Sequence, residues 1–147
     1  MIEDFQFYVE KGVVKKTVPN RENAGALMAR ANARLEYVRK QEIGKDTAPF
    51  IFEDVYEVLR EASQAVMELE GCKPYSHEAQ IAFLRDVRKF PEHLISAFDR
   101  LRVLRNKCLY GAAHVSPETC REALGFAVSV FPELKKLFDK ESRVALR

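Results

Sequence analysis

Residues that interrupt helices are scarce in this sequence. Glycine and proline each occur only six times in 147 residues, and no segment sustains the apolar–polar alternation of a β-strand. No repeat of about 20–50 residues is present, which argues against solenoid and propeller folds. Hydrophobic residues make up 47% and charged residues 31% of the chain, a balance typical of an ordered globular domain. These features predict one domain built from long helices.

Cysteine is also scarce, which limits the covalent and metal chemistry of the chain. Cys72, Cys108 and Cys120 are odd in number and lack CxxC spacing, so neither a disulfide framework nor a zinc site is predicted. Cys108 falls on an apolar helical stripe and is interpreted as a small buried hydrophobic residue. The histidines are too widely spaced along the sequence to indicate a metal centre. We therefore expect no metal and no cofactor.

Several familiar functional motifs are missing as well. The chain has no GxGxxG or GxxxxGK phosphate loop, no HExxH zinc motif and no GxSxG nucleophile elbow. The N-terminal segment MIEDFQFYVEKG is acidic where a secretory signal is basic, and no apolar run reaches the length of a membrane span. We therefore expect a cytoplasmic protein that has no membrane partner.

The formal charge of +2 is too small to imply nucleic-acid binding, but it is unevenly distributed. Residues 1–70 hold 10 basic and 13 acidic residues, whereas residues 71–147 hold 14 basic and 9 acidic residues. Between Arg85 and Lys107, seven basic residues stand against three acidic ones. Such a patch can attract phosphate groups, but a solvated basic helix face explains it equally well. Both interpretations stay open.

Helical periodicity divides the chain into an N-terminal arm (1–19), a helical bundle domain (20–139) and a flexible tail (140–147). The fold class predicted for the domain is an all-α, antiparallel up-down bundle of four long helices and one short helix, because the connections are short. The helices are expected at Arg21–Gln41, Pro49–Glu70, Ser76–Arg88, Pro91–His114 and Pro117–Phe138.

Local signals mark the ends of these helices. Asn20, Ser76 and Ser116 are the expected N-caps, since their side chains can accept a hydrogen bond from a free backbone N–H. Residues 72–75 are expected to form a loop, and Pro132 is expected to kink or restart the last helix.

The segment Pro49–Glu70 separates apolar from charged residues more clearly than any other. It is expected to lie at the centre of the bundle together with the helix that begins at Pro91. We interpret its charged face, including Glu53 and Glu57, as solvated rather than as a general acid and base. The apolar stripe consists of Ile51, Val55, Val58, Leu59, Ala62, Val66 and Leu69.

The second central helix carries an arginine inside its apolar stripe. At about 100° per residue, Arg105 lies about 20° from Leu94 around the helix axis. Burying a guanidinium without a partner is costly, so either a carboxylate meets Arg105 or the stripe opens into a cleft. Arg102, Asn106 and Tyr110 form a polar ridge beside it. The stripe itself contains Leu94, Phe98, Leu101, Cys108 and Ala112.

The segment RNKCLY, residues 105–110, resembles the RNxxxH signature of HEPN domains, which are small helical bundles often linked to nucleotide-binding proteins. The segment MELEGCKPYSHEAQIAFL is similar to the helix–Gly–loop–SH–helix part of that family. The continuation RNKCLYGAAHVSPETCREALGFAV is similar to its last two helices. The resemblance covers roughly Arg21 to Leu137.

This resemblance implies a homodimer. In active members, an arginine and a histidine of each subunit meet in a cleft at the dimer interface and cleave RNA without a metal. The 2′-hydroxyl is the nucleophile, the histidine is the acid–base and the arginine stabilises the phosphorane. Many short members are paired with a nucleotidyltransferase in toxin–antitoxin systems.

In this chain Arg105 and Asn106 match the signature, but Tyr110 occupies the histidine position. A phenol with a pKa of about 10 is a poor base at neutral pH, so we expect Tyr110 to pack with its hydroxyl hydrogen-bonded. His114 lies one helical turn further on and can substitute only if the helix continues past Tyr110. His77 is expected to be a surface residue in the first turn of its helix.

The leading hypothesis is a homodimer that binds a nucleotide, RNA or a nucleotidyltransferase partner, with weak or absent nuclease activity. Arg102, Arg105 and Asn106 are the expected phosphate-binding residues, on the face that is expected to form the dimer interface. One alternative is a metal-independent, toxin-like endoribonuclease that uses Arg105 with His114 or Tyr110. The other alternative is a purely structural dimerisation module in which Arg105 only specifies the interface.

Overall fold

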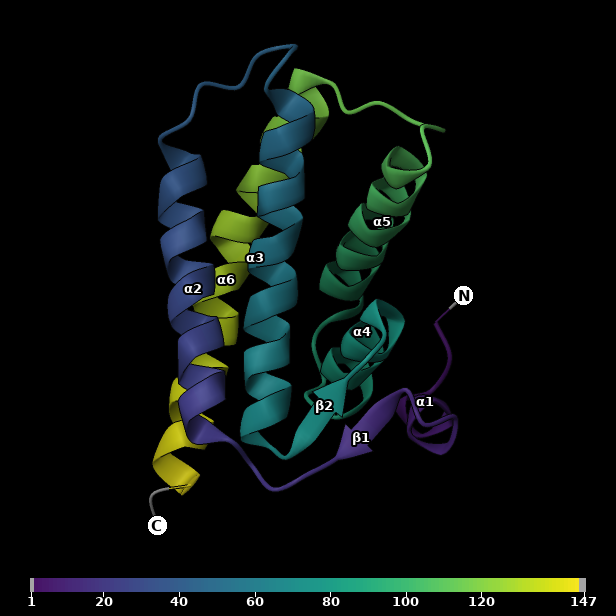
Figure 1. The fold of residues 1–147 in the computed structure, drawn as a ribbon, viewed down its shortest axis with the longest axis vertical. Helices are drawn as coiled ribbons and strands as arrows, with labels where there is room; N and C mark the ends of the chain where they lie inside the picture. The colour runs from purple at the N-terminus through teal and green to yellow at the C-terminus, as the bar shows by residue number, and fades with distance from the viewer. Residues whose placement is uncertain (1, 146–147) are drawn as a thin grey trace.

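The computed structural model describes residues 2–145 and shows a predominantly helical chain with one small β-sheet (Figure 1). In chain order the elements are α1 (Phe5–Glu10), β1 (Val14–Lys16), α2 (Arg21–Arg39), α3 (Ala48–Leu69), β2 (Cys72–Pro74), α4 (His77–Asp86), α5 (Glu92–Leu109) and α6 (Pro117–Ala145).

Helix α3 is the centre of the molecule. Fifteen of its 22 side chains are buried, whereas a helix on the surface buries only one stripe. In Figure 1 α2 lies beside α3, α6 lies behind these two helices and α5 lies on the other side of α3. The expected apolar stripe of this helix is therefore confirmed as core, but the opposite face is also covered. Its largest fully buried side chains are Phe52, Tyr56, Leu59 and Met67.

The predicted N-caps are confirmed. The side chain of Asn20 accepts a hydrogen bond from the backbone N–H of Asn23 at 2.9 Å at the start of α2. The hydroxyl of Ser76 accepts from Ala79 at 3.3 Å at the start of α4. The hydroxyl of Ser116 accepts from the N–H of Thr119 at 3.1 Å, directly before α6. These local signals start three helices at the residues that the sequence indicated.

The N-terminal arm is part of the core. Phe5, Tyr8 and Val14 are buried, and Val14 pairs with Pro74 in an antiparallel sheet formed by β1 and β2. The prediction of a loop at residues 72–75 was therefore wrong for 72–74. These strands could not be predicted from the sequence, because three residues are too few to show a period and the two paired strands lie far apart in the chain.

Helix α5 is shorter and more peripheral than the sequence predicted. It ends at Leu109 rather than His114, and Gly111 follows in the left-handed region with φ of 73°. Only Ile95, Phe98 and Arg102 are buried along it. The prediction that this helix shares the centre with α3 was wrong, because most of its apolar stripe is only half-buried.

Helix α6 continues without interruption through Pro132 as far as Ala145, so Pro132 does not restart it. The flexible tail was expected to begin at Lys140, but residues 140–145 are helical and Glu141 pairs with Arg88 at 2.9 Å. The last two residues of that tail lie outside the described part of the chain. Among residues 2–145, no helix combines the length and apolar character that a membrane span requires.

Candidate functional site

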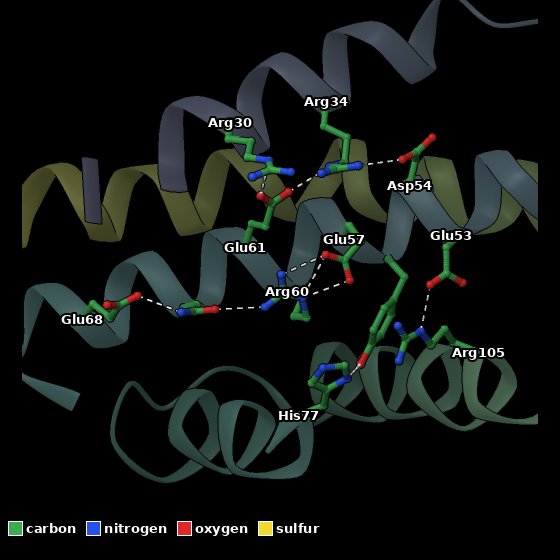
Figure 2. A network of polar contacts seen from close by, with 12 residues as sticks. Arg30, Arg34, Glu53, Asp54, Glu57, Arg60, Glu61, Glu68, His77 and Arg105 are labelled. Atoms are coloured by element: carbon green, nitrogen blue, oxygen red, sulfur yellow. Dashed lines mark hydrogen bonds and ion pairs between the residues drawn. The ribbon is translucent and has the colours of Figure 1, made fainter. Parts of the chain in front are cut away.

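Arg105 projects from α5 towards α3 and meets a carboxylate there (Figure 2). Its Nε donates to Oε1 of Glu53 at 3.0 Å, and its Cζ lies 5.4 Å from the centroid of the Tyr56 ring. The sequence left two alternatives for this arginine, a carboxylate partner or a cleft in the stripe, and the structure shows the carboxylate partner. Within the described residues, the two Nη groups have no hydrogen-bond partner, and neither is buried. The guanidinium of Arg105 is thus oriented by Glu53 and Tyr56, and its two Nη groups are free to bind another group.

Tyr56 connects Arg105 to a histidine of α4. The ring of Tyr56 is fully buried, and its hydroxyl lies 2.9 Å from Nδ1 of His77. Burial raises the pKa of Tyr56 well above its usual range, so the phenol stays neutral. Burial also lowers the pKa of His77, and the neighbouring charges of Arg105 and Arg60 lower it further. His77 is therefore half-buried and bonded, not the surface residue that the sequence predicted.

Arg102 pairs with different carboxylates from Arg105 and is almost inaccessible to solvent. Its Nε donates to Asp99 at 2.7 Å, and its Nη1 donates to Glu78 of α4 at 3.4 Å. The side chain of Arg102 is 11% exposed. It joins α5 to α4, and in this geometry it offers little surface to a ligand.

The other residues of the predicted site are dispersed. Asn106 is partly exposed next to Arg105. Tyr110 is 87% exposed, so the expectation that it packs with a bonded hydroxyl was wrong. His114 is exposed in the loop after α5. Because the helix ends at Leu109, His114 does not lie one helical turn beyond Tyr110. Among residues 2–145, the hydrogen bond of the Arg105 side chain goes to Glu53, and none joins it to Asn106, Tyr110 or His114.

The charged face of α3 is a chain of paired groups rather than a solvated surface. Arg60 donates to Glu57 at 2.9 Å and to Gln64 at 2.9 Å, and Gln64 donates to Glu68 at 2.8 Å (Figure 2). Burial alone would raise the pKa of Glu57, but the hydrogen bonds and charge of Arg60 outweigh it and the pKa is lowered. The sequence interpretation of a solvated face therefore holds for Glu53, whose side chain is 39% exposed, but not for Glu57, which is paired and 21% exposed.

A second cluster joins α2 to α3. Glu61 is only 2% exposed and forms ion pairs with Arg30 at 3.1 Å and with Arg34 at 2.8 Å. Arg34 also pairs with Asp54 at 2.7 Å. Two guanidiniums thus compensate one buried carboxylate, as a buried charge requires. All of these groups are matched with one another, so the cluster is structural.

Neither a metal centre nor a reactive thiol stands out among residues 2–145. No group of three or more His, Cys, Asp or Glu side chains in this range is placed to hold a metal ion. The three cysteines are free thiols, and burial raises the pKa of Cys108 and of Cys120. A thiol with a raised pKa is a weak nucleophile at neutral pH.

The residues that the sequence analysis missed are Tyr56 and the pairing role of Glu53. Tyr56 lies on the same helix as the predicted stripe but was not included in it, and Glu53 was assigned to solvent.

No protein family, no curated protein and no solved structure was found to match this chain.

Proposed function

We propose that this protein is a homodimeric, HEPN-like helical bundle that binds a nucleotide, RNA or a nucleotidyltransferase partner, with weak or absent nuclease activity. In this proposal the four long helices α2, α3, α5 and α6 form the antiparallel up-down bundle of that family. The RNKCLY segment at the end of α5 is its signature, with tyrosine in place of the histidine.

The observation that carries this proposal is the free fork of Arg105. Glu53 accepts a hydrogen bond from the Nε group and the Tyr56 ring contacts the guanidinium, which restricts the direction of the side chain. Both Nη groups remain unpaired within the described residues. A planar fork of N–H donors matches two oxygens of a phosphate group, and pre-orientation reduces the entropy lost on binding. Asn106, the next residue in the chain, is a further polar group and is partly exposed.

The position of the candidate bases supports weak or absent cleavage. Tyr110 is exposed at the end of α5 and His114 lies in the following loop. General base catalysis needs a base within hydrogen-bond reach of the proton it removes. His77 contacts the same Tyr56 side chain as Arg105, but its Nδ1 is already engaged with the Tyr56 hydroxyl and its pKa is lowered by burial.

One observation favours the purely structural alternative. Each arginine of this region has a carboxylate partner within its own chain: Arg60 has Glu57, Arg102 has Asp99 and Arg105 has Glu53. Such pairs reduce the positive field that attracts an anion. In this second proposal the cluster only joins α3, α4 and α5.

Titration calorimetry with inorganic phosphate and with a nucleoside monophosphate separates the two proposals. We expect the wild type to bind, Arg105→Ala to lose most of the affinity and Arg105→Lys to recover part of it. Arg39→Ala, at an exposed arginine of α2, is the matched control and should bind like the wild type. Equal affinity of Arg105→Ala and wild type, or no binding by either, would favour the structural module. Incubation with RNA, with and without a chelator, measures cleavage separately.

A further inference from the structure

His77 and Arg105 approach the same tyrosine ring from different helices (Figure 2). The His77 ring centroid lies 5.5 Å from the centroid of the Tyr56 ring, and the central carbon of Arg105 lies 5.4 Å from it. The imidazole and the guanidinium are therefore no more than about 11 Å apart, close to the distance over which salt screens exposed charges, about 10 Å at 0.1 M. Both side chains are partly buried, and partly buried charges are screened less.

The charged side chains that face His77 are mostly basic. Burial is the main reason that the pKa of His77 is lowered, and among the charged groups Arg105 has the largest effect. Glu57 alone acts in the opposite direction, and it is already paired with Arg60 at 2.9 Å. A proton on His77 therefore meets repulsion in the free protein. The charged groups that face His77 are Glu57 and Arg60 of α3 and Arg102 and Arg105 of α5.

Helix α1 and strand β2 also pack against α4, but their polar groups near this end are engaged with other partners. The hydroxyl of Tyr8 in α1 donates to Glu78 at 3.3 Å, and Glu78 also accepts from Arg102 at 3.4 Å. The ammonium of Lys73 in β2 lies 5.9 Å from the centroid of the Tyr75 ring. The electrostatic environment of His77 is therefore set from α3 and α5.

An anion bound to the two Nη groups of Arg105 would offset the charge that opposes protonation of His77. The hydrogen bond to Tyr56 allows this change, because a phenol hydroxyl can donate to a neutral imidazole nitrogen or accept from a protonated one. Coupling between two sites is reciprocal, so a proton on His77 raises the affinity for the anion by the same factor as the anion raises the affinity for the proton.

We propose that His77 couples the candidate phosphate site to pH by taking up a proton when an anion binds to Arg105. This inference rests on the phosphate site of the proposed function and adds how that site is regulated. In the free protein the pKa of His77 lies below its usual 6.5, so His77 is neutral at pH 7.5 and the coupling contributes little there. As the pH falls below about 6.5, a growing share of His77 is protonated and the affinity for the anion rises.

Titration calorimetry with sulfate at pH 7.5 and pH 5, at constant ionic strength, tests the coupling. Sulfate keeps its double negative charge at both pH values, whereas inorganic phosphate itself titrates between them. We expect the wild type to bind sulfate about threefold or more tightly at pH 5, part of a typical coupling of about 5–150-fold. His77→Gln should match the wild type at pH 7.5 and lose most of the gain at pH 5. His93→Gln and His114→Gln, at exposed histidines, are the matched controls and should keep the gain.

NMR titration of the histidine ring protons gives an independent test that needs no substitution at His77. Sulfate should raise the pKa of His77 in the wild type and leave those of the exposed His93 and His114 unchanged. In Arg105→Ala the pKa of His77 should be higher from the start, because a repelling charge is gone, and sulfate should no longer raise it.

The possible failures of the coupling and of the phosphate site differ. No sulfate binding by the wild type at either pH overturns the phosphate site and the coupling with it. Binding that leaves the pKa of His77 unchanged, or a gain at pH 5 that persists in His77→Gln, overturns the coupling and leaves the site standing. A gain that disappears in His114→Gln instead identifies His114 as the coupled group and also overturns the proposal for His77.

Discussion

The guanidinium of Arg105 contacts a carboxylate and an aromatic ring and is also partly exposed to solvent. Glu53 takes one N–H group and the Tyr56 ring lies 5.4 Å from the central carbon, while the side chain stays 19% exposed. Because Glu53 is itself 39% exposed, the pair adds little to stability. Its main effect is to orient the guanidinium. This division of roles makes Arg105 a residue whose loss should change binding more than folding.

Restoring the family signature tests whether Tyr110 marks a lost activity. Tyr110 is 87% exposed, so Tyr110→His should not change stability. If histidine at this position acts as the base, RNA cleavage should rise by about 10²–10⁴-fold over the wild type. Adding Arg105→Ala should abolish the gain, because the developing negative charge loses its cation. Strong cleavage by the wild type that disappears in His114→Ala would instead identify His114 as the base.

His77 makes stability depend on pH. Its pKa is lowered in the folded protein from a usual 6.5, chiefly by burial and then by Arg105. The folded state therefore binds this proton less tightly, so the contribution of His77 is fully present above about pH 6.5 and is lost as the pH falls through the folded pKa. His77→Gln keeps a partner for Tyr56 but cannot titrate. We expect urea unfolding at pH 7.5 and pH 5 to show a smaller loss for the variant than for the wild type.

On the scale of elements, α3 shows how a helix can be central and charged at once. Its carboxylates lie where α2, α4 and α5 cover it, and arginines compensate them. Such an arrangement does not by itself add stability, because desolvation offsets the attraction between buried charges. Removing one member, however, leaves the others uncompensated.

A substitution at Glu61 measures the free energy lost when one member of such a cluster is removed. Glu61→Gln removes the charge that holds both Arg30 and Arg34, although Arg30 is largely exposed. We expect the free energy of unfolding to fall by about 2–4 kcal/mol, towards the lower end of the range for breaking a buried pair. Glu36→Gln is the control, since its pair with Arg39 is exposed and 3.8 Å long. It should cost about 0.5 kcal/mol or less. Equal losses would show that Glu61 is effectively solvated.

The connection from α3 to β2 depends on Gly71. Its φ is 80°, and a Cβ built there would lie 2.6 Å from the carbonyl oxygen of Thr17. Gly71→Ala therefore combines backbone strain with a clash, and we expect a loss of about 2 kcal/mol or more in unfolding free energy. Gly25→Ala, in the interior of α2 with no atom within 4 Å of the added carbon, should instead gain about 0.5–1 kcal/mol. Chemical denaturation of both variants checks the contrast.

On the scale of the whole molecule, the N-terminal arm closes one end of the core. Phe5 packs edge-on against Phe83 with ring centroids 5.5 Å apart, and Asp86 accepts a hydrogen bond from the N–H of Phe5 at 2.8 Å. Arg85 donates to the carbonyl oxygens of Ile2 and Glu3. The arm therefore belongs to the same folding unit as α4, although it precedes the bundle in sequence.

Deleting residues 1–16 tests whether the N-terminal arm belongs to the same folding unit as α4. Phe5, Tyr8 and Val14 are buried, and each such side chain contributes about 1.5–3 kcal/mol on burial. We expect the truncated chain to lose several kcal/mol of unfolding free energy, a large share of the about 5–15 kcal/mol that a domain has. An unchanged urea midpoint would mean that the arm is only attached to the surface.

The sequence by itself determined where most of the helices begin and which faces are apolar. Asn20, Ser76 and Ser116 act through hydrogen bonds to residues three positions away, and the stripe of α3 follows from a period of 3.6 residues. Both are local properties, so they can be predicted from the sequence alone. The end of α5 at Leu109 was harder to predict from the sequence, because Gly111 permits either the end of the helix or a loosened continuation.

Only the tertiary structure decided which groups face one another. Arg105 meets Glu53, 52 residues away, and β1 pairs with β2 across a similar separation. Such partners depend on how the helices pack, and periodicity along one helix shows a face without showing what covers it. The charged side of α3 was therefore assigned to water, and Tyr56 was overlooked. Ion pairs and hydrogen bonds act over a few ångströms in space, while the sequence records distance only along the chain.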